Sequence, residues 1–521
     1  MRNAHAVAEV RVAESALMAK VPEGALMQRA ASGLAAACAG LLARAAHPPG
    51  TPGTRGTRGV YGSRVVVLAG SGDNGGDALH AGARLAARGA VVTAIAAGSR
   101  VHEGGTSALL SSGGRLIEAS DDRARPAIAA ADLIIDGLLG IGGRGGLRDP
   151  GAWLAAAAER SRGLVVAADL PSGIDADTGE VAGAAVRADV TVTFGTWKPG
   201  LLIDPGASHA GVVELVDIGL GRYLGPPAVA AAQAADVASW LPRPTAESDK
   251  YRRGVLGIVA GSDRFTGAAQ LSVGAAVRGG AGMVRLVSAP PAAAVVRQHW
   301  PEAVITTTGD TTGGQVIKAA GQVQAWVAGP GMGTAEPAED LLAAVLATSL
   351  PVLVDADGIT VLTAHRELLS RSAPTLLTPH AGELARLLGA DRADIESRRL
   401  RYATQAAAEL GCTVLLKGST TVIASPAGGH PVMVNPTGTS WLATAGSGDV
   451  LSGLAGALLA QGLDPVRAAA AGAYLHGIAA RLGADGAPIG ASDVIGALPA
   501  AIRSVAAALD GQATASETPE G

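Results

Sequence analysis

The stretch VVVLAGSGDNGGDALHAGARLAARG, residues 65–89, decides the fold. A run rich in β-branched residues leads into a glycine-rich turn, and the alanine- and leucine-rich run that follows stops at Gly89. This order is typical of a strand, a tight turn and a helix. Gly70, Gly72 and Gly75 fit G-x-G-x-x-G, in which glycines let backbone N–H groups approach a phosphate at a helix N-terminus. A tight turn that binds nothing is the alternative.

The same alternation of strand-like and helical runs continues to about residue 220 and starts again near residue 254. Strands that alternate with helices form a mainly parallel sheet covered on both faces, so the sequence predicts two α/β domains. The candidate strands lie within residues 64–70, 90–98, 131–140, 163–173 and 188–195, and then within 254–262, 282–289, 325–331, 351–358, 375–380 and 412–419.

The domain boundary is expected within residues 223–245, which contain proline and charge and in which we expect no strand. A chain of 521 residues is too long for one ordinary core. Because the two halves do not resemble each other, we predict a fusion of unlike domains over residues 1–225 and 236–510. Within the first domain we expect N-terminal helices in 1–47 and a mobile connection in 48–63, and residues 511–521 are expected to form a disordered tail.

Composition narrows the function classes. The net charge is only −4 and the chain has no basic run, which argues against nucleic acid as a partner. Cys38 and Cys412 are expected to be ordinary buried thiols of a reducing compartment. No stretch reaches ~18 uncharged apolar residues, and no signal peptide opens the chain. We therefore expect a cytoplasmic protein with no membrane partner, and a homo-oligomer.

Oxygen-bearing side chains follow the strands of the first half. The stretch VVTAIAAGSR, 91–100, lacks the acid that would hold a ribose, which disfavours an ordinary dehydrogenase. Carboxyl ends of parallel strands converge on one crevice. Asn74, Asp136 and Ser172 could there supply oxygen ligands for a hard cation, which leaves Asp169 as a candidate acid or base. Each residue taken alone is also a common turn former or helix cap.

A second GSGD occurs in TAGSGDVLSGLAGALLAQG, residues 444–462, after a stretch that resembles a loop. Val450, Leu451, Leu454 and Leu458 lie on one helical face. Ser447 is the expected N-cap, which places Asp449 in the first turn, where free N–H groups can bind an anion. Asp449 could act as the base for a hydroxyl that attacks a phosphate held there. The alternative is that Asp449 only complements the helix dipole.

Other predicted strand ends of the second half carry side chains that could also contact a phosphate or another ligand. LLKGSTT, 415–421, offers Lys417 and hydroxyl groups as a second phosphate contact. LTPHAGELARLL, 377–388, places His380 at a strand-to-helix junction, although a single histidine is more often structural. GPGMG, 329–333, and VDADG, 354–358, mark two further strand ends.

At this point a family resemblance is visible in the first half. GSGDNGGDA (70–78), DGLLGIGGRGG (136–146), ADLPSGIDADTG (168–179) and TFGTWKPGL (193–201) resemble the motifs of the NAD(P)H-hydrate epimerase domain. Two positions depart from the family pattern: Asp73 replaces an asparagine and Ala78 replaces a glycine. The resemblance implies a Rossmann-like three-layer fold, potassium ligated by Asn74, Asp136 and Ser172, and substrate contact by Asp169. It also implies substrate binding by Asp73, Asn74, Gly75, Gly76, Asp77, Gly140, Ile141, Gly142, Gly143, Arg144, Gly145 and Gly146.

The second half resembles the NAD(P)H-hydrate dehydratase branch of the ribokinase-like fold. The matching motifs, from KYRRGVLGIVAGSDRFTGAA (250–269) through GGAGMV, AGPGMG, DADG, TPHAGE and KGSTT to AGSGDVLSG (445–453), occur in family order. This resemblance implies ADP with Mg²⁺ as co-substrate. It implies nucleotide binding by Lys417, Gly418, Ser419, Thr420, Thr421 and Gly448, and hydrate contact by Ala268, Gly331, His380 and Asp449.

Together the two resemblances predict a bifunctional repair enzyme. The first half would interconvert the R and S forms of NAD(P)H hydrate, and the second would dehydrate the S form with conversion of ADP to AMP and phosphate. Two alternatives stay open: the second half could be a vitamin or sugar kinase, and the first half a non-catalytic binding module.

Overall fold

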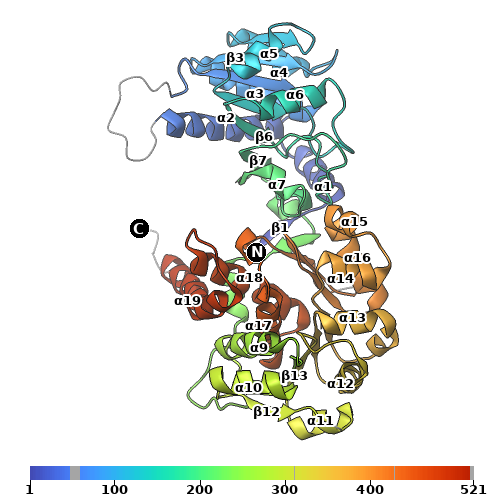
Figure 1. Cartoon of the computed structure of the whole chain (residues 1–521). Helices are drawn as coiled ribbons and strands as arrows, with labels where there is room; N and C mark the ends of the chain where they lie inside the picture. Colours follow the sequence, from blue (N-terminus) through green and yellow to red (C-terminus); the bar gives the residue numbers. More distant parts are fainter. Residues whose placement is uncertain (47–58, 310, 427–428, 517–521) are drawn as a thin grey trace. The chain divides into compact units, whose positions relative to one another are not determined.

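Both predicted α/β domains are present in the computed structural model, which describes residues 1–46, 59–309, 311–426 and 429–516 (Figure 1). The chain divides into two compact units. One spans Asn3–Val229, and the other consists of Met1–Arg2 with Ala230–Gly521. Most of the loop expected in 48–63 lies outside the described residues.

The first unit contains a parallel sheet in the order β4-β3-β2-β5-β6-β7-β8. Its strands are β2 (Arg64–Ala69), β3 (Val91–Ala96), β4 (Arg115–Glu118), β5 (Leu133–Gly137), β6 (Leu164–Ala168), β7 (Val190–Phe194) and β8 (Val212–Val216). The sequence pattern missed β4 and β8, which form the two edges of this sheet. Edge strands bury less apolar surface, so their sequence signal is weaker.

Helices cover both faces of this sheet. They are α1 (Val7–Met18), α2 (Ala25–Ala46), α3 (Asp73–Ala87), α4 (Glu103–Ser111), α5 (Ala124–Ala129), α6 (Gly151–Glu159) and α7 (Ala207–Ala210). Val65 and Val67 pack into one core with α2 and α3, whereas Val66 and Leu68 pack into another with α5 and α6. Alternate residues of one strand thus face opposite layers, which confirms the predicted three-layer architecture.

The second unit contains a mixed sheet in the order β9-β18-β17-β16-β15-β14-β13-β10-β11-β12. In this order, every pair of neighbouring strands between β16 and the edge strand β12 is parallel. Strand β17 is antiparallel to both of its neighbours, β16 and β18. Its strands are β9 (Val229–Ala231), β10 (Val255–Val259), β11 (Met283–Ser288), β12 (Val304–Thr307), β13 (Ala325–Ala328), β14 (Val352–Val354), β15 (Thr375–Leu377), β16 (Thr413–Leu416), β17 (Thr421–Ala424) and β18 (Val432–Asn435).

The helices of this unit are α8 (Ala234–Trp240), α9 (Thr266–Arg278), α10 (Pro290–His299), α11 (Gly313–Ala320), α12 (Glu336–Leu346), α13 (Asp357–Ala364), α14 (Ala381–Leu388), α15 (Arg392–Ser397), α16 (Arg399–Leu410), α17 (Ser447–Ala460), α18 (Pro465–Ala484) and α19 (Ala491–Ser516). The predicted α/β class is confirmed for both domains. Helices α2 and α19 are long and apolar enough to cross a membrane by length and composition alone, but each packs buried residues into a core.

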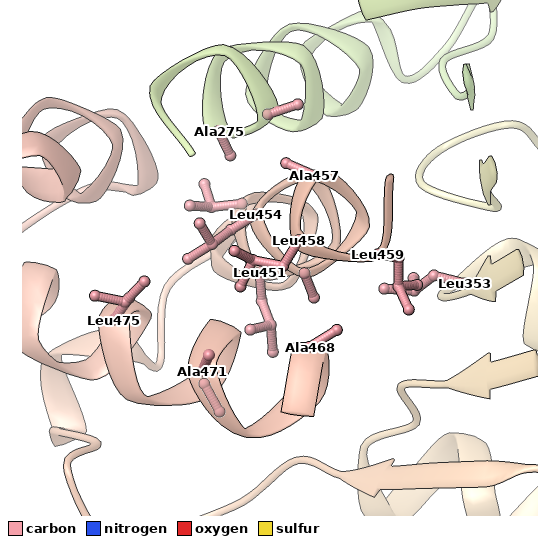
Figure 2. Packing of buried hydrophobic residues seen from close by; sticks show 14 of the residues in the cluster. Ala275, Leu353, Leu451, Leu454, Ala457, Leu458, Leu459, Ala468, Ala471 and Leu475 are labelled. Atoms are coloured by element: carbon pink, nitrogen blue, oxygen red, sulfur yellow. The ribbon is translucent and has the colours of Figure 1, made fainter. Parts of the chain in front are cut away.

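Helix α17 lies at the centre of the second core, as Figure 2 shows. Its apolar residues contact α9 on one side and α18 on the other. The side chains labelled in Figure 2 are Leu451, Leu454, Ala457, Leu458 and Leu459 of α17, Ala275 of α9, Leu353 of β14, and Ala468, Ala471 and Leu475 of α18. A Cβ on Gly453 would lie 2.1 Å from the Ser272 carbonyl oxygen, and one on Gly456 would lie 2.2 Å from Val327 Cγ2. The close packing fixes the position of the Asp449 turn.

Two expectations about chain segments differ from the structure. Residues 223–245 were expected to hold no strand, but β9 and α8 lie there. The short stretch Val229–Ala231 is fully buried, and a capping box of Gln233 and Asp236 begins the helix. Helix α19 also includes residues 511–516, part of the expected tail, and residues 517–521 lie outside the described residues.

Candidate active sites

The first glycine-rich turn packs directly on the end of a neighbouring strand. The Gly70 N–H donates to the Gly137 carbonyl at 3.0 Å, and a Cβ on Gly70 would lie 1.9 Å from the Leu138 carbonyl oxygen. Helix α3 begins at Asp73 immediately after this turn. A Cβ on Gly140 would lie 3.1 Å from Asn74 Cβ. The structure therefore brings together the two predicted substrate segments, 73–77 and 140–146.

Substitution of Gly75 by alanine should destabilise the first unit by about 1–3 kcal/mol, because it overpacks the turn. The new Cβ would lie 2.2 Å from the Gly70 carbonyl oxygen. Gly72→Ala is the matched control, since a Cβ there meets nothing within 4 Å, and it should change the free energy of unfolding by less than about 0.5 kcal/mol. Chemical denaturation of both variants measures the difference, and equal values would contradict the packing argument.

Asp136 and Ser172, two of the predicted cation ligands, are in direct contact. Ser172 Oγ donates to Asp136 Oδ1 at 2.7 Å, and Ser172 N donates to Asp136 Oδ2 at 2.8 Å. Both residues are fully buried. Burial raises the pKa of Asp136 to about 6, against hydrogen bonds from Ser172 and Leu138 that lower it. The hydrogen bonds described for this carboxylate come only from neutral donors.

This arrangement fits a hard cation. A buried carboxylate is costly unless positive charge offsets it. The Asn74 backbone carbonyl would lie 3.1 Å from a Cβ on Gly137, the residue after Asp136, so the third predicted ligand is adjacent. The Asn74 amide nitrogen is buried with no hydrogen-bond partner, so this side chain is not committed to a described contact. The three side chains present carboxylate, amide and hydroxyl oxygens, which suit a hard cation.

Asp169 occupies a strained backbone position and accepts several hydrogen bonds. Its φ is 66°, in the left-handed region that non-glycine residues seldom adopt. Asp169 Oδ1 accepts from Thr193 Oγ1 at 3.2 Å and from Phe194 N at 3.1 Å. It also pairs with the ammonium of Lys198, which is 1% exposed. The structure thus holds the Asp169 side chain in one orientation at the end of β6.

Sequence reasoning missed Lys198 as a functional residue. It is one of only five lysines in a chain rich in arginine, and it lies in the quoted motif TFGTWKPGL. Those two signals could have singled it out, but its partner could not be inferred, because Asp169 lies 29 residues earlier in the sequence.

Further carboxylates surround this pair. The pKa of Asp77 is raised well above its ordinary value, by burial first and then by the charges of Asp169 and Asp73. Burial and Asp169 also raise the pKa of Glu14 on α1, a residue that the sequence did not indicate. Arg11 of the same helix has Nη2 3.6 Å from a Cβ on Gly142. Helix α1 therefore forms one wall of the first site.

The second glycine-rich turn begins α17, with a different cap from the predicted one. Gly446 is the N-cap, with φ 86° in the left-handed region, and Ser447 is the first helical residue. The prediction of Ser447 as N-cap was wrong by one position, because glycine adopts this backbone without a Cβ penalty. Ser447 Oγ instead donates to the Leu442 carbonyl at 2.8 Å. Asp449 lies in the first turn, as expected.

Lys417 reaches the first turn of α17 from the end of β16. Its Nζ donates to Asp355 Oδ1 at 2.7 Å and lies 3.8 Å from Glu383 Oε2. It also lies 3.4 Å from a Cβ on Gly448, so the structure brings together two of the predicted nucleotide-binding residues. Residues 418–420 form the turn between β16 and β17, and Thr421 begins β17. Asp355 and Glu383 were not predicted as site residues.

Asp449 lies in the first turn of α17 and has a raised pKa. Burial first, and then the charge of Asp355, raise this pKa to about 7 against the lowering effect of Lys417. Ser272 of α9 donates to the Asp449 carbonyl at 3.2 Å, which anchors its backbone. A general base is most effective when its pKa lies near the working pH.

His380 caps helix α14 beside this turn. Its Nδ1 accepts hydrogen bonds from Gly382 N at 3.0 Å and Glu383 N at 3.2 Å, so that nitrogen carries no proton. Burial lowers its pKa, which favours the neutral imidazole. A backbone bridge connects His380 with Lys417. The half-exposed ring can then offer Nε2–H to a ligand, so a structural cap and a binding role are compatible.

The two remaining predicted hydrate contacts touch each other. A Cβ on Gly331 would lie 2.7 Å from Ala268 Cβ and 2.9 Å from Phe265 Cβ. Gly333 N donates to Asp357 Oδ2 at 2.9 Å, which ties this turn after β13 to the turn after β14 that carries Asp355. The ends of β13, β15 and β16 thus carry Gly331, His380 and Lys417, whereas the first turns of α9 and α17 carry Ala268, Gly448 and Asp449.

Two further features concern metal-binding clusters and thiols in the part of the chain that the structure describes. No group of three or more His, Cys, Asp or Glu residues is arranged there to hold a metal ion. Cys38 and Cys412 are free and buried, as predicted, and burial raises the pKa of each thiol to about 12.

Comparisons with known proteins match both halves. A family model described as YjeF-related protein N-terminus matches residues 23–200, and one described as NAD(P)H-hydrate dehydratase matches residues 256–494. The bifunctional NAD(P)H-hydrate repair enzyme of Mycobacterium tuberculosis is 48% identical over 472 residues, which cover 90% of this chain and 92% of that protein. The Mycobacterium leprae enzyme of the same description is 46% identical over 486 residues, covering 93% and 94%.

Among solved structures, the second half is similar to an ADP/ATP-dependent NAD(P)H-hydrate dehydratase from Bacillus subtilis that was co-crystallised with ATP and Mg²⁺. The identity is 30% and the TM-score 0.46, with coverage of 52% of this chain and 97% of that one.

Proposed function

Because the chain belongs to the family of bifunctional NAD(P)H-hydrate repair enzymes, we propose a specific division of work between its two units. Residues 1–225 interconvert the R and S forms of NAD(P)H hydrate. Residues 236–510 dehydrate the S form and convert ADP to AMP and phosphate. The observation that carries this proposal is the meeting of Lys417, Gly448 and Asp449 at the N-terminus of α17.

Dehydration requires a better leaving group than hydroxide. Asp449 takes the proton of the ring hydroxyl, and the hydroxyl oxygen attacks the β-phosphorus of ADP while AMP leaves. The N–H groups of the α17 N-terminus and the Lys417 ammonium stabilise the charge on the transferred phosphoryl group. The ring nitrogen then expels phosphate, and loss of a ring proton restores the dihydropyridine.

Epimerisation requires ring opening or reversible loss of the hydroxyl, with an acid or base beside the ring. Asp169 is the proposed group, since Lys198, Thr193 and Phe194 hold its carboxylate in one orientation. The neighbouring turns of residues 73–77 and 140–146 would hold the phosphates and ribose of the hydrate.

Two cations complete the proposal. Potassium, held by Asn74, Asp136 and Ser172, would neutralise the buried carboxylate and the substrate phosphates. Mg²⁺ would enter with ADP and screen its phosphates. We further propose a cytoplasmic homo-oligomer, which light scattering of the purified protein and cell fractionation would test.

A single assay tests the function. Purified protein is mixed with chemically made hydrate and either ADP or ATP, while the absorbance of the reduced ring is followed. The proposal predicts that both epimers are consumed and that AMP and phosphate appear with ADP. A phosphorylated vitamin or sugar in place of restored NAD(P)H would instead identify a kinase.

Lys417→Arg should raise the KM for ADP by about tenfold although it keeps the charge. The ammonium lies between Asp355 and the Gly448 turn, and a planar guanidinium does not fit the space of a compact ammonium. Lys318→Arg, an exposed lysine on α11, is the matched control and should leave the KM unchanged. Steady-state kinetics of both variants decide the matter, and an unchanged KM in Lys417→Arg would remove Lys417 from the nucleotide site.

A further inference from the structure

Asp355, at the end of β14, is a buried carboxylate whose two oxygens are both committed. Oδ1 accepts from Lys417 Nζ at 2.7 Å, and Oδ2 accepts from Ser452 Oγ at 2.6 Å. The residue is 1% exposed. Its backbone is equally constrained, because a Cβ on Gly329 would lie 1.8 Å from the Asp355 carbonyl oxygen. Asp355 is therefore a fixed point against which a mobile side chain can be held.

We propose that Asp355 is a positioning residue of the dehydratase site, which holds the Lys417 ammonium against the first turn of α17 and places a negative charge near Asp449. This inference rests on the proposed function and adds to it a residue that contacts neither substrate. A residue of this kind acts through its partners, so its removal should change how those partners bind and titrate.

The first part of the argument concerns the position of Lys417. A lysine side chain has about four rotatable bonds, so fixing it in one conformation when a ligand binds costs conformational entropy. Here Asp355 fixes the ammonium before any nucleotide arrives, 3.4 Å from a Cβ on Gly448. Glu383 is the second anion near this ammonium, at 3.8 Å. Preorganised charge of this kind favours the transition state, because no reorganisation is required during the reaction.

The second part concerns the charges that Asp449 experiences. The charged groups around it are Asp355 after β14, Lys417 after β16, Asp357 on α13 and Glu383 on α14. Asp355 has the largest effect among the three carboxylates, and all three raise the pKa of Asp449. His476 of α18, near Lys417, adds no charge, since burial lowers its pKa to about 4. Loss of the Asp355 charge should therefore lower the pKa of Asp449.

The test uses the full chain with S hydrate and ADP, assayed from pH 5 to 9. Asp355→Asn should raise the KM for ADP by about tenfold, because Lys417 is no longer held. It should also move the acidic limb of the kcat profile down by about one pH unit. Asp355→Glu keeps the charge and should keep the wild-type limb. A purely structural role would lower thermal stability without moving that limb.

Asp357→Asn is the comparison variant. Asp357 also faces Asp449, but its described hydrogen bond is to Gly333 N, not to Lys417. It should shift the limb less than Asp355→Asn and leave the KM for ADP unchanged. The shift of the pH limb reports the electrostatic effect of each carboxylate on Asp449, whereas the KM for ADP reports the positioning of Lys417.

A double-variant cycle covers the possibility that Asp355→Asn fails to fold with an unpaired buried lysine. The Lys417→Gln/Asp355→Asn double variant removes both charges. If Asp355 positions the nucleotide through Lys417, the second substitution should change the KM for ADP by less than about twofold in this background. A folded Asp355→Asn with wild-type KM and pH limb would overturn the proposal, as would fully multiplicative effects on the KM in the cycle.

The proposed function fails separately. If the wild-type chain restores no NAD(P)H from hydrate, the dehydratase assignment is wrong, whatever Asp355 does. Calorimetric titration with ADP still compares wild type with Asp355→Asn in that case. A tenfold weaker affinity supports the positioning of Lys417, and an equal affinity overturns it.

Discussion

The dehydration rate of the Asp449→Asn variant should be about 10²–10⁴-fold lower than that of wild type. The epimerisation rate of the same protein should stay at the wild-type value. The amide keeps the shape of the side chain but cannot accept the hydroxyl proton, and loss of a general base has effects of this size. Mass spectrometry or NMR of the R-to-S exchange measures epimerisation, and absorbance of the reduced ring measures dehydration. Near-native dehydration would remove Asp449 from the mechanism.

The pH dependence provides an independent check on the same residue. Asp449 must be ionised to act as a base, and its pKa is raised to about 7, so the wild-type rate should rise with pH through about pH 7. Between its ordinary value of 3.8 and about 7, the folded chain binds more protons here than the unfolded chain. Stability therefore falls as pH rises through that window.

Asparagine cannot ionise, so Asp449→Asn should unfold at the same temperature as wild type or higher at pH 8. Calorimetry at that pH excludes unfolding as the cause of lost activity. A lower unfolding temperature would show instead that the ionised Asp449 carboxylate stabilises the fold, contrary to the burial argument.

Consumption of racemic hydrate by Asp169→Ala should take a two-phase course. The S form is dehydrated rapidly, and the remainder then disappears at the rate of spontaneous epimerisation. Loss of this acid or base should slow enzymatic epimerisation by about 10²–10⁴. Wild-type protein should consume both epimers in one phase. Native consumption of both epimers by the variant would contradict the role of Asp169.

Asp169→Ala also leaves the buried Lys198 without its carboxylate, which is destabilising by about 3–5 kcal/mol in comparable pairs. Asp169→Asn is the second variant, because it retains an acceptor for Thr193 and Phe194. Asp121→Ala is the matched control: this partly exposed aspartate forms its described ion pair with Arg123, two residues away, and consumption should remain single-phase. Circular dichroism of each variant confirms that the first unit is folded.

A fragment provides the same separation by a different route. The fragment should start at Ala230 and not at Asp236, because α8 begins at Ala234 and packs on α19 and α18. Residues 230–516 alone should dehydrate only the S form. A folded fragment without nucleotide-dependent activity would show that the dehydratase site needs residues outside this unit.

Strand ends were predictable because buried parallel strands are continuous apolar runs that stop at glycine or aspartate. That is why Asp136 and Asp169 could be selected from the sequence, whereas Asp449 was selected as the acid in the first turn of a predicted helix. The antiparallel strands β17 and β18 and the short β12 were missed, since their apolar runs are brief and follow loop-like residues. Asp355 lay within a quoted strand end, but its role depends on a lysine 62 residues later, which no local pattern reveals.

The dense packing of α17 has a consequence for the dynamics of the dehydratase site. From Val450 to Ala460 every residue of this helix is buried, between α9, α18 and the sheet. Its central amide protons should exchange with solvent only when the whole unit unfolds, at the slowest rates in the chain. The turn that carries Gly448 and Asp449 is anchored to that slowest-opening segment. We therefore expect the turn that carries Asp449 to lack the local fluctuations that reposition catalytic loops in other enzymes. Conformational changes on substrate binding should instead occur in the turns at the ends of the neighbouring strands.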